Sequence, residues 1–178
     1  WPQARALLIA DPHFGKAACF REAGMPVPRG TTAADLDRLS ELIQRTGAET
    51  LYILGDFYHA ASGRVAPVEN ALAAWRARHA GLAVVLIPGN HDGHAGRPPA
   101  ELGITEQPGP LAVPPLVLAH EPGDDPRGPV LAGHVHPAAR LNDAGISFRL
   151  PCFHVTDAGL VLPAFGSFTG MHSVEKQP

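Results

Sequence analysis

Aspartate, asparagine and histidine recur along this chain in small clusters that follow short apolar runs. The clusters are Asp11-Pro12-His13, Gly55-Asp56, Gly89-Asn90-His91-Asp92, His120 and Gly133-His134-Val135-His136. In the first cluster, the two side chains lie two residues apart, so an extended backbone places them on the same side. Carboxylate, amide and imidazole ligands without thiolate suit Mn²⁺, Fe, Zn²⁺ or Ni²⁺. The clusters therefore indicate a site for a divalent metal.

Each cluster taken alone has a simpler interpretation. Asp11-Pro12 can start an ordinary turn, and Asp56 can cap the segment that follows it. Taken together, seven candidate ligands exceed what one ion needs, and these are Asp11, His13, Asp56, Asn90, His120, His134 and His136. Two ions roughly 3.5 to 4 Å apart that share a bridging carboxylate would use them all and would stabilise an in-line displacement at phosphorus.

The elements that must position these residues can be read from the apolar pattern. Buried strands are expected at 5–10, 51–54 and 82–87, and each ends at one of the polar clusters. Helices are expected from Thr31 or Thr32 to about Thr46 and from about Ala66 to His79, where His79 would complement the helix dipole. Right-handed crossovers through these helices place the strands side by side, which brings Asp11, Asp56 and Asn90 to one sheet edge.

The second half of the chain has a different pattern. We expect loops over 17–30 and 97–115, where glycine and proline are frequent. Short strands are predicted at 116–119, 130–132, 147–150, 153–156 and 160–162. Because no helical pattern follows Ala80, this half is expected to form a mainly antiparallel sheet packed against the first.

Length and composition limit the class of protein. The 178 residues suit a single domain over 1–178, and the start at Trp1 without methionine leads us to expect that a natural N-terminal strand is missing. The net charge of -3 argues against a strong non-specific grip on nucleic acid. Two cysteines, no signal-peptide pattern and no apolar run near the roughly 20 residues of a membrane span predict a cytoplasmic protein without a membrane partner.

In their order and spacing, the five clusters resemble the motifs of the calcineurin-like metallophosphoesterases. The resemblance covers most of the chain and implies an α/β fold, a four-layer α/β/β/α sandwich with two divalent metal ions, most often Mn²⁺, at the strand ends. It implies that Asp11, His13 and His136 hold one metal, that Asn90, His120 and His134 hold the other, and that Asp56 bridges them. A metal-activated water would be the nucleophile.

The same resemblance implies roles for residues that are not ligands. His91 would stabilise the transition state or protonate the leaving oxygen, and Asp92 would orient it. His59 stands where the Mre11-type nuclease branch carries a histidine close to the phosphate. Lys16 and Arg21 are candidates to bind the substrate phosphate, although a loop charge is an equal or simpler interpretation for each.

Longer stretches narrow the expected function. The runs DPHFGKAACFR, VPRGTT, LRLPCF and LPAFGSFTG resemble the bacterial ligase-associated DNA-damage-response phosphodiesterases, which implies DNA or RNA as substrate and a ligase or helicase partner. The chain departs from that family at Pro12 and Phe14, where leucine is common, and at Met171, where glycine is usual. A small-molecule phosphatase or nucleotide pyrophosphatase, and a non-catalytic scaffold, remain the alternatives.

Overall fold

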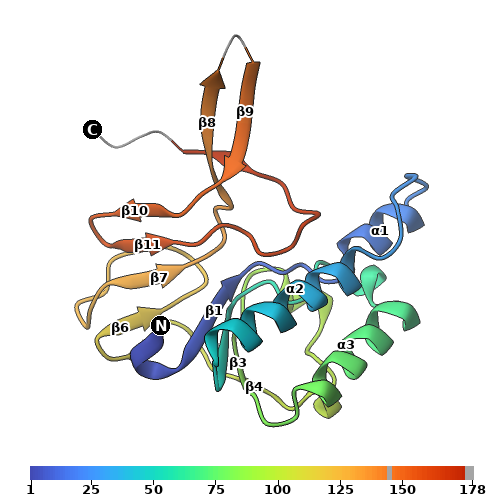
Figure 1. The fold of residues 1–178 in the computed structure, drawn as a ribbon, viewed down its shortest axis with the longest axis horizontal. Helices are drawn as coiled ribbons and strands as arrows, with labels where there is room; N and C mark the ends of the chain where they lie inside the picture. The colour runs from blue at the N-terminus through green and yellow to red at the C-terminus, as the bar shows by residue number, and fades with distance from the viewer. Residues whose placement is uncertain (144–145, 175–178) are drawn as a thin grey trace.

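A computed structural model describes residues 1–143 and 146–174, and its first layer is a parallel sheet (Figure 1). The sheet comprises β1 (Ala6–Ala10), β2 (Thr50–Leu54), β3 (Ala83–Ile87) and β4 (Ile104–Glu106), in that spatial order. All three strand pairs are parallel, and Ala10, Leu54 and Ile87 lie in register at their carboxyl ends. The predicted side-by-side arrangement of the first three strands is confirmed.

Two long helices cover one face of this sheet (Figure 1). They are α2 (Thr31–Thr46) and α3 (Ala66–Arg78), which agree closely with the predicted helices. Helix α2 ends because Gly47 adopts a left-handed conformation, with φ of 62°, and its N–H reaches back to the carbonyl of Ile43. The buried side chains of both helices pack on the sheet; they are Leu36, Leu39, Ile43, Val68, Leu72 and Trp75.

The opposite face of the parallel sheet packs against a second, five-stranded sheet. It contains β5 (Leu111–Val113), β6 (Leu116–Leu118), β7 (Val130–Ala132), β10 (His154–Thr156) and β11 (Gly159–Val161), in the order β10-β11-β7-β6-β5. The outer pairs are antiparallel, but β11-β7 and β7-β6 are parallel. The prediction of a mainly antiparallel sheet is therefore wrong, because β7 is reached through a loop crossover rather than a tight hairpin.

A third, small sheet carries a long hairpin. It is built from β8 (Pro137–Asp143), β9 (Ile146–Pro151) and β12 (His172–Ser173), with β8 in the middle. Strand β8 was not predicted, and β9 extends the predicted 147–150 strand by one residue at each end. The hairpin projects away from the two larger sheets (Figure 1).

The α/β class is confirmed, and the hydrophobic core lies in two layers. One layer fills the space between the parallel sheet and its helices, and the other lies between the sheets around Ala10, Leu54, Ile87, Leu118 and Leu162. Among the described residues, no helix follows the 3-10 turn at Ala100–Leu102, so the outer helical layer of a four-layer sandwich is not formed by them.

Short elements lie where loops were expected. Helix α1 (Lys16–Glu22) occupies part of the predicted 17–30 loop, and β4 and β5 lie within the predicted 97–115 loops. The remaining short helices are η1 (Pro2–Ala4), η2 (Ala61–Gly63), α4 (Asp92–Ala95) and η3 (Ala100–Leu102). None of the helices in the described part of the chain has the length and apolar character that a bilayer crossing requires.

Candidate metal centre

The polar clusters meet at one edge of the two facing sheets. Asp11, Asp56 and Asn90 follow β1, β2 and β3, while His120 follows β6 and two histidines follow β7. This convergence arises because the carboxyl ends of parallel strands share an edge, and β6 and β7 are themselves parallel. All seven candidate ligands named in the sequence analysis lie in this cluster.

A first group of donor atoms comes from Asp11, His13 and His136. One ligand atom from each lies within 4.8 Å of the others. The Nε2 atoms of the two imidazoles are 3.4 Å apart, and Nε2 of His136 is 3.7 Å from Oδ2 of Asp11. Three donors at this spacing can share one ion.

A second group comes from Asn90, His120 and His134. Oδ1 of Asn90 is 2.9 Å from Nε2 of His120 and 3.1 Å from Nδ1 of His134, and the two ring nitrogens are 3.0 Å apart. This triangle of donors does not overlap with the first group in any residue. The two sets implied by the sequence resemblance are thus two adjacent groups, which meet where Nδ1 of His120 lies 3.6 Å from Oδ1 of Asp11.

Asp56 lies between the two groups and faces both. Its Oδ2 is 3.6 Å from Nε2 of His13, and its Oδ1 is 3.7 Å from Nε2 of His120. The backbone N–H of His91 donates a 2.9 Å hydrogen bond to Oδ1 and fixes the carboxylate. The Asp56 side chain is therefore oriented with one oxygen toward each group.

Burial and hydrogen bonding in the cluster fit a metal site. Asp11 and Asp56 are 0% and 2% exposed, and Oδ1 of Asp11 is buried without a hydrogen-bond partner. A buried carboxylate oxygen without a donor is costly unless a cation meets it. Burial, with help from Lys16, lowers the pKa of His13 to about 2, so this imidazole is neutral and can act as a ligand.

The backbone at these residues is strained. Asp11, His13, Asp56, His134 and His136 have φ angles of 50°, 44°, 52°, 70° and 52°. Non-glycine residues rarely adopt this left-handed region, and each costs of order 1 to 3 kcal/mol. Such strain persists where surrounding structure imposes it, and here it gathers at the candidate ligands.

Motif glycines leave room for the ligand side chains. A Cβ atom at Gly55, whose φ is 85°, would collide with the imidazole of His120, and one at Gly133 would lie 2.5 Å from Oδ2 of Asp11. A Cβ at Gly89 would likewise collide with the Asp56 carboxylate. Glycine is required at these three positions because a ligand from another strand passes directly over each of them.

A second layer of hydrogen bonds orients the donors. Nδ1 of His120 donates to the carbonyl oxygen of Leu54 at 3.1 Å, which leaves Nε2 with its lone pair facing Asn90 and His134. The backbone N–H of His134 donates to Oδ2 of Asp11 at 2.8 Å. Partners of this kind fix the tautomer and direction of metal ligands.

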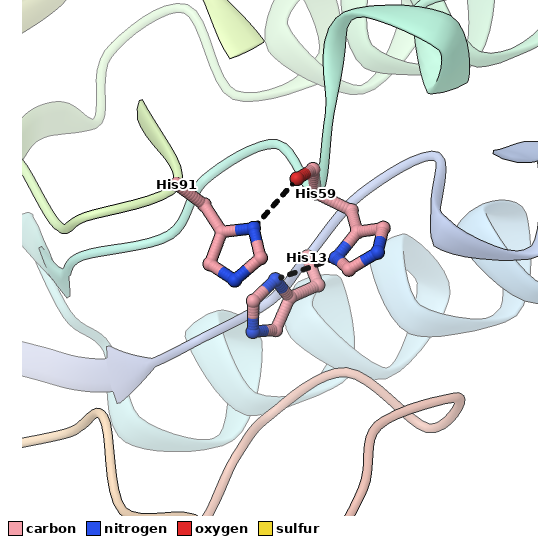
Figure 2. Close-up of side chains that lie close together, drawn as sticks. All are labelled: His13, His59 and His91. Carbon is pink, nitrogen blue, oxygen red and sulfur yellow. Dashed lines mark hydrogen bonds between the residues drawn. The ribbon is translucent and has the colours of Figure 1, made fainter. Parts of the chain in front are cut away.

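His13, His59 and His91 form a further cluster, which shares His13 with the first group of donors (Figure 2). The rings of His59 and His91 are stacked with centroids 4.9 Å apart, and His13 meets both edge-on. Nδ1 of His91 donates to the carbonyl oxygen of His59 at 2.7 Å. Burial is the main cause that lowers the pKa of His59 to about 4, and the charges of Lys16 and His91 add to the effect.

Asp92 does not make the orienting contact that we expected. Its two carboxylate oxygens accept backbone N–H bonds from Asp56, Phe57 and Gly89, at 2.9, 2.9 and 2.8 Å. His91 is held instead by the backbone of His59. The difference arises because helix α4 begins at Asp92 and turns its side chain back under the β2 and β3 strand ends.

The two candidate phosphate-binding residues lie in different surroundings. Lys16, at the start of α1, is close enough to the site for its charge to lower the pKa of His13 and of His59. Burial lowers the pKa of Lys16 itself, and the nearby Asp56 carboxylate acts in the opposite direction. Arg21 lies one turn further on and donates to the carbonyl of Pro28 at 3.0 Å. The structure brings Lys16 to the cluster and ties Arg21 to a surface loop.

Sequence reasoning missed the contacts made around Tyr58 and His59. The hydroxyl of Tyr58 donates to Glu69 at 2.7 Å, and the guanidinium of Arg64 pairs with Glu69 and lies 4.6 Å from the Tyr58 ring centroid. On the other side, Phe20 lies 6.5 Å from the His59 ring and 5.3 Å from Phe168. Nothing in the spacing of these residues reveals the contacts, because they join four separate segments.

Together, the fold and the cluster define a metal-dependent phosphoesterase. The profile of the calcineurin-like phosphoesterases matches residues 4–134. The chain belongs to this family, and the predicted class of enzyme, a metal-dependent phosphodiesterase, is confirmed.

One solved structure is especially similar. The nuclease MPE of Pseudomonas putida is 46% identical, with a TM-score of 0.87 over 98% of this chain and 82% of that one. More distant are the Aquifex aeolicus protein of unknown function AQ665 (20% identity, TM-score 0.48, 79% and 81% covered) and the E. coli phosphoesterase Yfce (14%, 0.44, 92% and 94%). No curated protein matches the chain.

Proposed function

We propose that this protein cleaves nucleic-acid phosphodiester bonds with two divalent metal ions. The observation that carries the proposal is the Asp56 carboxylate, which directs one oxygen toward each donor group while His91 stands beside it. In this proposal Asp11, His13 and His136 hold one ion, and Asn90, His120 and His134 hold the other. When bound, such a pair of ions supplies an activated water and stabilises the charge on the phosphate oxygens, and Mn²⁺ is our choice for this set of oxygen and nitrogen donors.

The remaining residues act on the phosphate and the leaving group. Because the Nδ1–H of His91 donates to the carbonyl of His59, Nε2 is the ring nitrogen left to act on the substrate. When both ring nitrogens of His91 carry a proton, the Nε2–H can protonate the leaving oxygen while Nδ1 keeps its own proton. The stacked His59 ring borders the same space and would contact the phosphate. Lys16 adds a positive charge there, and Asp92 acts as a positioning residue that holds the strand ends. Arg21, bonded to the surface loop, is the weakest candidate.

The similarity to the Pseudomonas putida nuclease supports a nucleic-acid substrate. That protein matches almost the whole chain, including the segment beyond residue 134 that the family profile does not cover. His59 is the residue that we expect to distinguish a diesterase from the phosphatases of the family. We therefore assign DNA or RNA as the substrate class.

Replacement of His91 tests the mechanism. We expect His91→Ala to keep two metal ions and to lose about a hundredfold to ten-thousandfold in turnover of bis(p-nitrophenyl) phosphate and of a DNA oligonucleotide. His94→Ala is the matched control, since His94 is an exposed histidine three residues away. Metal analysis and steady-state kinetics give the readouts. Parent-like turnover in metal-saturated His91→Ala would contradict the assignment.

The net charge favours one alternative, a phosphatase or pyrophosphatase that acts on a small molecule. A chain with 14 basic and 17 acidic residues attracts a polyanion weakly. Comparison of aryl phosphate monoesters, nucleotide pyrophosphates and diesters with Mn²⁺ separates the two functions. A strong preference for monoesters would exclude the diesterase.

We also propose a role in bacterial DNA repair, in the cytoplasm and together with a ligase or helicase. The support is the resemblance of the DPHFGKAACFR and LPAFGSFTG stretches to ligase-associated phosphodiesterases. A strain without the protein should be more sensitive to DNA-damaging agents, and parent protein but not His91→Ala should restore resistance. Equal restoration by both would mean that the role is that of a scaffold.

A further inference from the structure

The β8-β9 hairpin has two chemically different faces. In an antiparallel pair, directly opposed residues lie on the same face and neighbours along a strand alternate between faces. The register pairs Arg140 with Arg149 and Asn142 with Ser147, which puts four hydrogen-bond donors on one face. The other face carries exposed apolar side chains, and these are Leu141, Ile146, Phe148 and Leu150.

The opposed arginines indicate what the donor face binds. Like charges directly opposite each other destabilise a strand pair. Both Arg140 and Arg149 are exposed, and no carboxylate whose side chain the structure describes forms an ion pair with either. By contrast, seven other arginines pair with a nearby carboxylate, as Arg45 does with Glu41 and Arg127 with Asp125. An anion that meets both guanidinium groups would relieve their repulsion.

The hairpin is joined directly to the metal centre. Strand β8 begins at Pro137, the residue after the candidate ligand His136, and its root is anchored by the fully buried Ala138 and by β12. At about 3.3 Å per residue, Arg140 lies roughly 13 Å along the strand from His136. That reach corresponds to about four phosphates of one DNA strand at 3.4 Å each.

We propose that the donor face of the hairpin, formed by Arg140, Asn142, Ser147 and Arg149, binds phosphates of the nucleic-acid strand that is cut at the metal centre. This inference rests on the proposed function and adds a second contact point for that substrate. It also explains how a chain of net charge -3 contacts a polyanion, because two exposed arginines lie directly opposite each other on a projecting ribbon (Figure 1). A two-stranded ribbon is narrow enough to enter a major groove or to lie along a single strand.

The apolar face offers a different partner, a second copy of this chain. Phe148 and Ile146 are 48% and 58% exposed there. We favour the donor face as the functional one, because its two opposed arginines are complementary in charge to a chain of phosphates. Dimerisation through the apolar face would leave this pair of arginines unexplained. The double variant Leu141→Ser/Phe148→Ser tests this alternative, because it would change the oligomeric state if the apolar face binds a second copy.

The experiment compares two double variants that remove the same charge. Arg140→Gln/Arg149→Gln alters the hairpin, and the control Arg45→Gln/Arg78→Gln alters exposed arginines of α2 and α3. Binding of fluorescent single-stranded and duplex DNA is followed by anisotropy over a range of salt concentrations, without added metal. Hydrolysis of bis(p-nitrophenyl) phosphate is measured on the same preparations with Mn²⁺.

We expect the hairpin variant to bind DNA about tenfold more weakly at low salt. Its plot of log affinity against log salt should be shallower by about 1.4 to 1.8, the value for two lost phosphate contacts, while the control stays close to the parent. Hydrolysis of the aryl diester should be unchanged in both variants, because this substrate is too small to reach Arg140.

Three results would overturn the inference. The first is DNA binding by the hairpin variant that equals that of the parent, and the second is an equal loss of binding in the control variant. The third is a combination: Leu141→Ser/Phe148→Ser changes the oligomeric state, and replacing the two hairpin arginines does not change DNA binding. Failure of the proposed function looks different. In that case the parent hydrolyses the aryl diester but does not cut DNA, and the binding measurements still decide whether the hairpin holds a nucleic acid.

Discussion

The parallel sheet and the second sheet contribute to the same site in different ways. The first has three five-residue strands that are followed by Asp11, Asp56 and Asn90, and two helices cover one of its faces. The second has three-residue strands joined by loops, and it supplies only histidines. The acidic and amide oxygens therefore come from the more regular sheet, and three of the four candidate imidazole ligands come from the less regular one.

The contacts between the sheets show why both are needed. Gly55 at the end of β2 touches His120 from the second sheet, and Gly133 after β7 touches Asp11 from the first. Each sheet thus provides the space that a ligand of the other requires. The site depends on how accurately the two sheets are held together, and the predictions that follow test this dependence.

Loss of the bridging carboxylate should have the largest effect. Asp56→Ala removes the carboxylate that directs one oxygen toward His13 and the other toward His120, and the neighbouring buried imidazoles cannot replace a negative charge. We expect metal content and activity to fall together, and turnover to fall by about a hundredfold to a thousandfold. Metal analysis and hydrolysis of an aryl diester are the measurements. Retention of two ions would mean that the two sheets hold them independently.

A methyl group at the sheet-to-sheet contact should have the next largest effect. In Gly55→Ala, the new Cβ would displace His120, so metal affinity should fall about tenfold to a hundredfold, as for loss of an orienting contact. Gly24→Ala is the matched control, because Gly24 has nearly the same φ, 83° against 85°, with nothing within 4 Å of the added atom. A metal titration compares them. Similar affinities in the two variants would show that the added methyl group at position 55 does not disturb metal binding through His120.

A change within the first sheet should affect stability more than chemistry. In Asp92→Asn, one acceptor of three backbone N–H bonds is replaced by a donor, which should lower the free energy of unfolding by about 1 to 3 kcal/mol. Asp37→Asn, at an exposed carboxylate that pairs with Arg78 at 3.6 Å, should change it little. Chemical denaturation gives the free energies. If Asp92→Asn instead lost turnover at unchanged stability, Asp92 would be acting on His91.

The two sheets also differ in how far the sequence predicts them. Residues 50–54 and 31–46 combine a continuous apolar run or a helical stripe with clear stop signals, so local pattern and tertiary packing agree. Strand β8, with the sequence PAARLND, has neither, and its position is decided by pairing with β9 and β12. The positions of the candidate ligands could be predicted because their residue types are distinctive. The carbonyl of His59 that holds His91 could not, because every residue has such a group.

The smallest expected effect lies far from the metal centre, at His79. We expected this residue to be a cation at a helix end. In the structure, Nε2 of His79 donates to the hydroxyl of Ser40 at 2.9 Å. Burial is the main cause that lowers the pKa of His79 below the ordinary 6.5, and the charges of Arg78 and Arg76 lower it further. The folded protein therefore binds fewer protons here than the unfolded chain, so this residue stabilises the fold above about pH 6.5 and the contribution is lost as pH falls. His79→Gln keeps a donor that cannot titrate, and its free energy of unfolding should fall less than that of the parent between about pH 7 and about pH 5. If the free energy of unfolding changed with pH by the same amount in the two proteins, the imidazole would already be charged in the native state and would act on the dipole of α3.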